Sequence, residues 1–265
     1  FFFKQMTAYE IMPSLVGSEM CIRDRVIYRV QLEGRLRSFD RERSSEGETT
    51  MLRTAGLVLV FAAAVLLTGS GTATAQNPAH NHIGHVMDGW RDTPDSVGLL
   101  PAAIAEARVA AQHAELAAKD TSNLDAMKRH TAHVLHAVDP EQIENGPGGG
   151  YGVKKAAAGA AQHINAAAGA EGASDAVKTH ANHVATSANN TVTRADEIVA
   201  LAQRIASVGS AADAGPLVAQ LNDLTQALLT GVDANGDGRT GWQEGEGGLE
   251  VAETHANLMK QAEGL

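Results

Sequence analysis

A gap-free internal repeat constrains the fold of this chain more than any other feature. Residues 110–134 (AAQHAELAAKDTSNLDAMKRHTAHV) align with residues 160–184 (AAQHINAAAGAEGASDAVKTHANHV), and twelve of the 25 aligned positions are identical. Each copy is long enough for two helices joined by a short turn. Two such helical hairpins, packed about a pseudo-twofold axis, predict a four-helix bundle.

The composition of residues 76–265 favours helices throughout. About one residue in five is alanine, the strongest helix former, and the only aromatic residues are Trp90, Tyr151 and Trp242. Proline, glycine and capping residues mark the expected helix ends. The helices predicted from these signals cover 101–119, 122 to just before 139, 152–169, 174–207, 216–229 and 249–261. The sequence therefore predicts an all-α fold.

The first 75 residues are not expected to belong to this fold. Leu15–Arg25 (LVGSEMCIRDR) resembles the translation of a transposase adapter used in sequencing libraries, so residues 1–50 are interpreted as non-native read-through. Met51 then begins a positive segment, a short apolar run and an A-x-A site that ends at Ala75. This order is typical of a cleaved signal peptide over 51–75 and predicts a secreted or periplasmic protein.

Charge and cysteine content exclude several classes of function for residues 76–265. This part holds 12 Lys+Arg, 23 Asp+Glu and no cysteine, for a net charge of −11. An acidic chain repels nucleic acid and anionic lipid, so we expect neither a nucleic-acid partner nor stable membrane association after signal cleavage. Thiolate metal sites and cysteine nucleophiles are excluded. No catalytic motif is recognisable, so we do not predict an enzyme.

The repeat carries six histidines at matching positions, which are candidate ligands for a transition metal. In an antiparallel hairpin the first histidine of each copy comes level with the second, and the third lies one turn further along the same side. Each hairpin is therefore expected to gather three imidazoles. The six residues are His113, His130 and His133 in the first copy, and His163, His180 and His183 in the second.

Three interpretations of these histidines remain open. The first is a site for Zn²⁺, Cu²⁺, Ni²⁺ or Fe with imidazole ligands from facing helices. The second is haem with two axial histidines, His113 and His163, across the bundle axis. The third is a purely structural set, copied when the hairpin was duplicated. A pH-sensitive interaction module is a further alternative, because histidines titrate near pH 6.5.

The other five histidines have no partner in the repeat. His80, His82 and His85 form a short tract that can capture a metal, although a flexible, solvated segment is the expectation for residues 76–97. His136 and His255 are expected on polar helix faces.

The C-terminal part contains the sharpest local motif, DANGDGRTGWQE over residues 233–244. It resembles the EF-hand calcium loop at every ligand position, with Gly238 at the sharp turn. The resemblance implies a Ca²⁺ site between two helices, and Gly241 would hold a water ligand. The implied protein ligands are Asp233, Asn235, Asp237, Arg239 (through its carbonyl) and Glu244.

The loop departs from the EF-hand pattern in two ways. Thr240 replaces the usual aliphatic residue, and glycines at 245, 247 and 248 delay the second helix. No second loop is visible, so the expected affinity is weak, about 10⁻⁴–10⁻³ M in Kd. The expected organisation is a histidine-containing segment at 76–97, the duplicated-hairpin bundle at 98–209, and an EF-hand-like helix–loop–helix at 210–265.

Overall fold

The computed structural model describes residues 77–265, and this part of the chain is helical, without strands. The prediction of an all-α fold is confirmed. The signal peptide and the read-through segment lie outside the described residues. The helices are α2 (Pro78–Met87), α3 (Leu99–Ala118), α4 (Leu124–Val138), α5 (Val153–Gly169), α6 (Asp175–Ser207), α7 (Ala211–Thr230) and α8 (Leu249–Glu263), with a 3₁₀ turn at Pro94–Ser96.

Side-chain caps begin four of these helices. Asn77 caps α2, Asn123 caps α4, Ser174 caps α6 and Ser210 caps α7, and each accepts a hydrogen bond from a backbone N–H of the first turn. Ser122 was predicted to cap α4, but the cap is Asn123, one residue later, while the Ser122 hydroxyl donates to Asp120. The predicted start of α7 at Pro216 is wrong as well, because Ser210 caps the helix six residues upstream and Pro216 lies inside it, where it cannot donate a helical hydrogen bond.

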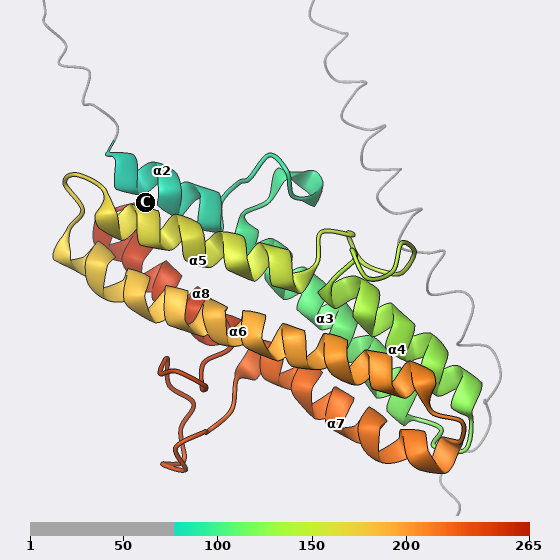
Figure 1. Ribbon diagram of the computed structural model, residues 1–265. Coiled ribbons are helices and arrows are strands. Elements are labelled where there is room, and N and C mark those ends of the chain that lie inside the picture. The colour runs from blue at the N-terminus through green and yellow to red at the C-terminus, as the bar shows by residue number, and fades with distance from the viewer. Residues whose placement is uncertain (1–76) are drawn as a thin grey trace, which may run out of the picture. The chain divides into compact units, whose positions relative to one another are not determined.

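The long helix α6 organises the described part of the molecule (Figure 1). Helices α2, α5 and α8 lie along its N-terminal half, whereas α3, α4 and α7 lie along its C-terminal half. The two hairpins, α3–α4 and α5–α6, pack through α3 on α5 and α4 on α6. Their turns lie at opposite ends of the bundle. At the start of α3, Leu99 packs against Gly159 of α5.

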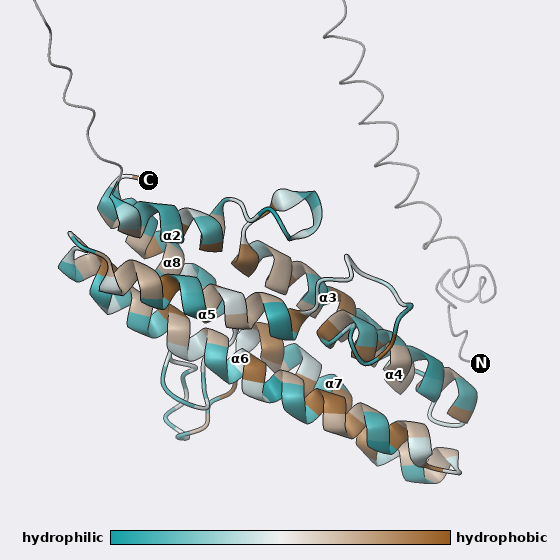
Figure 2. Ribbon diagram, turned by 45° about the horizontal axis from the view of Figure 1, so that its top comes forward, coloured by the Kyte–Doolittle hydropathy of each residue, from teal (hydrophilic) through white to brown (hydrophobic). Residues whose placement is uncertain are grey.

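Alanine forms more than half of the buried hydrophobic side chains, which allows the helices to approach closely. Larger side chains such as Ile83, Leu100, Met127, Ile198 and Met259 fill the spaces between the helices. Figure 2 shows hydrophilic and hydrophobic residues alternating along each helix, as expected for helices with one buried face. No helix among residues 77–265 is both long and apolar enough to cross a membrane.

The N-terminal segment is part of this core, so the expectation of a flexible segment at 76–97 is wrong. Ala79, Ile83 and Val86 of α2 are completely buried, and α2 packs mainly on α5. His80 Nε2 donates to Glu263 Oε2 over 2.8 Å, and Lys260 pairs with Asp88. The apolar stripe of α2 and these contacts to α8 hold the first helix in place.

Candidate metal centres

Nine of the eleven histidines gather into three clusters of three, and within each cluster the candidate ligand atoms lie within 4.8 Å of one another. The first cluster is His82, His85 and His163. The second cluster is His113, His130 and His133. The third cluster is His180, His183 and His255.

The three clusters share one construction. A His-x-x-His pair from one helix meets a single histidine from a second helix: α2 with α5, α4 with α3, and α6 with α8. Residues three apart lie on the same helix face, so each pair points its two rings in one direction. The pairs also share a following valine, in HIGHV at 82–86, HTAHV at 130–134 and HANHV at 180–184. That valine is buried in every case and fixes the helix rotation that presents the rings.

The distances between ring nitrogens match those of a metal's ligands. His113 Nδ1 lies 3.2 Å from His130 Nδ1 and 3.3 Å from His133 Nδ1. In the third cluster, His255 Nδ1 lies 3.1 Å from His180 Nδ1 and 3.3 Å from His183 Nδ1. A tetrahedral ion with metal–nitrogen bonds of about 2.0–2.1 Å places its ligand nitrogens about 3.3 Å apart.

Hydrogen bonds between the rings cannot satisfy all three facing nitrogens of a cluster. An imidazole nitrogen carries either one proton or one in-plane lone pair, so it makes one good hydrogen bond. In the second and third clusters one Nδ1 faces two others at bonding distance. A shared cation that accepts all three lone pairs removes the conflict.

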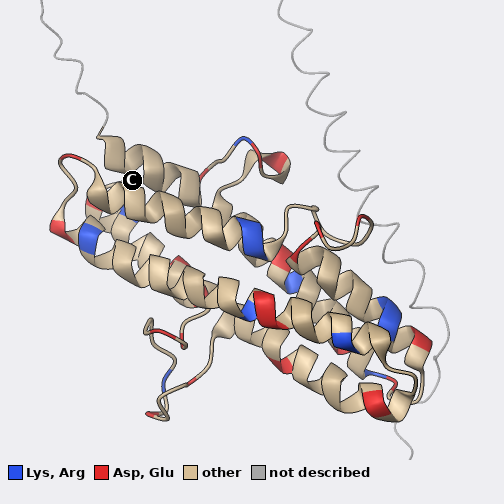
Figure 3. Ribbon diagram, viewed as in Figure 1, with Lys and Arg blue, Asp and Glu red and all other residues tan. Residues whose placement is uncertain are grey.

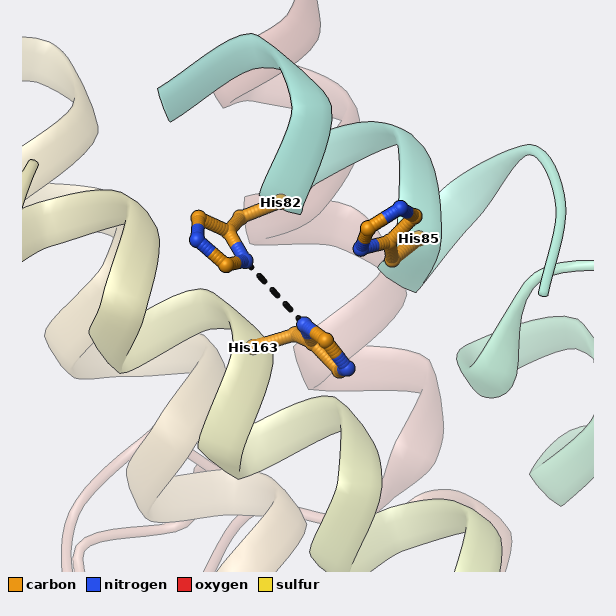
Figure 4. A group of neighbouring side chains, drawn as sticks. All are labelled: His82, His85 and His163. Carbon is orange, nitrogen blue, oxygen red and sulfur yellow. Dashed lines mark hydrogen bonds between the residues drawn. The ribbon is translucent and has the colours of Figure 1, made fainter. Parts of the chain in front are cut away.

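The first cluster is more open than the other two. His82 Nδ1 lies 3.1 Å from His163 Nδ1, and Figure 4 shows the His85 ring beside this pair. The rings of His85 and His163 are 4.9 Å apart at an interplanar angle of 79°. His85 Nδ1 is buried and has no hydrogen-bond partner among the described residues. In the tautomer protonated at Nε2, this nitrogen would offer its lone pair to a ligand.

The surroundings of seven cluster histidines lower their pKa and so favour the neutral ring that metal ligation requires. Burial, followed by the neighbouring His133 and His130, lowers the pKa of His113 to about 4. Burial is also the main cause that lowers the pKa of His85, His163, His183 and His255.

Few charged side chains surround the clusters. Figure 3 shows no charged residue on α2, and the acidic residues of the described part lie mostly at helix ends and in loops. No Asp or Glu belongs to any cluster. The ligand sets are therefore electrically neutral, which leaves a bound divalent ion its full charge.

Both tryptophans of the sequence cover histidines of the clusters. The Trp90 ring lies 4.7 Å from His163 and 4.9 Å from His85. The Trp242 ring stacks on His183 at 4.2 Å and 23°. No tryptophan lies at the second cluster, where His113 is instead the most buried ring of the nine.

The six repeat histidines all belong to clusters, but the expected grouping is right for only one hairpin. His113, His130 and His133 meet as expected. His163 does not join His180 and His183, because its ring points to α2, while the His180–His183 pair points to α8. His113 and His163, the candidate axial ligands for haem, lie in separate clusters.

His255 was not predicted as a ligand, and His82 and His85 were considered only as part of a flexible tract that can capture a metal. The recurrence of H-x-x-H-V at 82–86 was the sequence signal for His82 and His85. The expectation of polar faces is wrong for His255, which lies in the third cluster, and for His136. His136 is buried, and its Nδ1–H donates to Ile143 O over 2.9 Å.

The acidic loop, residues 232–248, joins α7 to α8. The Asp233 carboxylate accepts hydrogen bonds from the backbone N–H groups of Gly236, Asp237 and Gly238. Asp237 Oδ1 accepts from Arg239 N–H. Glu244 is exposed and lies in a turn, five residues before α8 begins. The structure does not gather Asp233, Asp237 and Glu244 into one group of ligand atoms, as it does for the histidine clusters.

Comparison with family models, with curated proteins and with solved structures finds no match for this chain.

Proposed function

We propose that this chain is an exported protein that binds transition-metal ions at three sites, one at each histidine cluster. The observation that carries the proposal is the approach of one Nδ1 to two others at 3.1–3.3 Å in the second and third clusters. All three clusters consist of a His-x-x-His pair and one partner histidine. This shared construction supports metal binding at the first cluster as well.

The chemistry of the ligands favours a borderline divalent ion. Imidazole suits Zn²⁺, Cu²⁺, Ni²⁺ and Fe²⁺, whereas Ca²⁺ and Mg²⁺ require oxygen ligands. Three protein ligands leave at least one coordination position open for water or for an exchanging ligand. An open position lets the bound ion exchange, which supports binding and release of the ion.

Elemental analysis of the untagged, exported chain tests this proposal, together with an absorption spectrum of the same sample. We expect three equivalents of one transition metal per chain after incubation with that ion and removal of the excess. His255→Ala and His113→Ala should each lower this number to two. His136→Asn is the matched control, because His136 belongs to no cluster, and it should leave three.

Retention of no metal from a panel of Zn²⁺, Cu²⁺, Ni²⁺ and Fe²⁺ would contradict the proposal. A Soret band would support the haem alternative instead.

We propose a second function, weak Ca²⁺ binding by the acidic loop. The complete EF-hand ligand register at 233–244 supports it, as does the Asp233 carboxylate, which turns inward on the loop backbone. Calorimetry should show one Ca²⁺ site with a Kd of about 10⁻⁴–10⁻³ M.

Glu244→Gln should abolish this binding, because it removes the carboxylate assigned to two coordination positions. Glu250→Gln is the matched control, since Glu250 is exposed on α8 outside the loop. Equal Ca²⁺ affinity in the native chain and in Glu244→Gln would contradict the assignment.

A further inference from the structure

Trp242 connects the acidic loop to the third cluster. It lies two residues before Glu244, and its ring covers one face of His183 at 4.2 Å and 23°. His183 Nδ1 faces His255 Nδ1 at 3.3 Å. The indole therefore restricts the orientation of a ring whose nitrogen belongs to the candidate metal site.

The segment after Trp242 is fixed to the same helix. Asn190 donates to Gln243 O and accepts from Gly245 N–H, and Arg194 donates to the carbonyls of Gly245, Glu246 and Gly247. Gly247 passes so close to α6 that a Cβ at this position would lie 2.5 Å from Ser187 Oγ.

These contacts all come from one face of α6. His183, Ser187, Asn190 and Arg194 are spaced by four, three and four residues, which places them in a single stripe. Residues 242–247 therefore follow this stripe, with the third cluster at its N-terminal end. Helix α8 begins directly afterwards at Leu249 and carries His255, the remaining ligand of the third cluster.

The outer half of the acidic loop is not hydrogen-bonded to α6 in this way. Residues 233–240 are exposed, and the side-chain hydrogen bonds of Asp233, Asn235 and Asp237 stay within the loop. Trp242 thus lies between an anchored segment and a segment that a Ca²⁺ ion would order.

We propose that Ca²⁺ in the acidic loop raises the affinity of the third cluster for its metal, with Trp242 as the positioning residue. The inference rests on the proposed function, because it requires both ions to bind. Ca²⁺ coordination by residues on both sides of Trp242 would restrict the backbone at this residue and hold the indole against His183. The rings then lose their conformational freedom when Ca²⁺ binds, before the transition metal arrives. The transition metal therefore binds more tightly, which is positive coupling between the two ions.

The first cluster is the natural control. It too lies under a tryptophan, Trp90, whose backbone N–H donates to Val97 O within the segment between α2 and α3. That segment has no EF-hand register. Ca²⁺ should therefore leave the metal affinity of the first cluster unchanged.

The test uses two forms of the full chain, each with one tryptophan-covered cluster intact. His82→Ala with His113→Ala leaves the third cluster, and His113→Ala with His255→Ala leaves the first. The affinity of each form for Zn²⁺ is measured by competition with a chromophoric chelator, in Ca²⁺ above the Kd of the loop or in equal Mg²⁺. Calorimetry on the same samples verifies Ca²⁺ binding.

We expect Ca²⁺ to tighten Zn²⁺ binding at the third cluster by about fivefold or more, and to leave the first cluster unchanged. Trp242→Ala should remove this increase without loss of Ca²⁺ binding, whereas Trp242→Phe, which retains a stacking ring, should keep it. By reciprocity, Zn²⁺ should tighten Ca²⁺ binding by the same factor.

Unchanged or weaker Zn²⁺ affinity, with both ions bound, would overturn the coupling and leave the proposed function intact. Failure of either form to bind Zn²⁺ at all would contradict the proposed function itself.

Discussion

At the scale of single residues, burial lowers the pKa of seven of the nine cluster histidines and so favours their neutral form. His113 shows this most clearly, because its ring is 9% exposed and burial, with two neighbouring histidines, lowers its pKa to about 4. Protonation is therefore unfavourable in the folded state near neutral pH, and the lone pair stays available for a metal.

This depressed pKa predicts that the metal-free protein loses stability in acid. Between pH 6.5 and 4 the unfolded chain carries a proton on His113 and the folded chain does not, so the free energy of unfolding falls as the pH falls. The contribution of His113 is at most about 3 kcal/mol. Denaturant unfolding of the metal-free chain at pH 7, 5.5 and 4.5 measures it. In His113→Asn the free energy of unfolding should depend less on pH. The same pH dependence as in the native chain would contradict the lowered pKa of His113.

The tryptophans predict a second residue-scale result, since each lies against a different cluster. In Trp90→Phe only Trp242 emits, and Cu²⁺ or Ni²⁺ at the third cluster should quench it by contact with His183. Adding His255→Ala should remove the high-affinity part of this quenching. Trp242→Phe with His255→Ala should still show quenching of Trp90 by the first cluster. Equal quenching with and without His255 would argue against an ion at the third cluster.

At the scale of elements, each cluster joins two helices, and α2 is the shortest helix that takes part. Ile83 lies between His82 and His85 in sequence and is completely buried. The packing of α2 on α5 therefore also holds His82 and His85 beside His163 of α5.

Ile83→Ala should consequently weaken the first cluster through the packing of α2. Removal of this buried side chain should cost about 2–5 kcal/mol in global stability or in local docking of α2. One metal equivalent should be lost, while the second and third clusters keep theirs. Loss of all three equivalents in folded protein would contradict this independence.

Gly84→Ala is the matched change within the same helix. Apart from Asp88 Oδ2 at 4.0 Å, nothing lies near a Cβ at this position, so alanine should stabilise α2 by about 0.5–1 kcal/mol and retain the metal. Thermal unfolding measures both variants.

At the scale of the whole molecule, the helices pack through their own alanine-rich core, and the clusters lie partly exposed at the margins of that core. Metal ions should therefore add stability to a fold that forms without them. We expect the circular dichroism of the chelator-treated chain to remain helical, with a lower Tm that rises with metal concentration. A coil spectrum after metal removal would show instead that folding requires the ions.

The sequence alone determined the helical class, most helix ends and the first hairpin cluster. Alanine content, caps and the His113–His130 spacing act within one helix or between two helices joined by a short turn, so local geometry decides their outcome. The ligand register of the acidic loop is contiguous and visible without a structure, and its Ca²⁺ site stays a prediction.

Only the tertiary structure decided the partners of His163, His180 and His183. A hairpin determines which residues come level along its axis, but not towards which neighbouring helix each ring turns. Here α2 and α8 pack on the outer sides of α5 and α6, so the second copy of the repeat divides its histidines between two new partners, where the first copy keeps its own. Packing across the whole core determines how each helix is rotated and which helices, distant in sequence, lie beside it. A repeat of 25 residues does not contain that information.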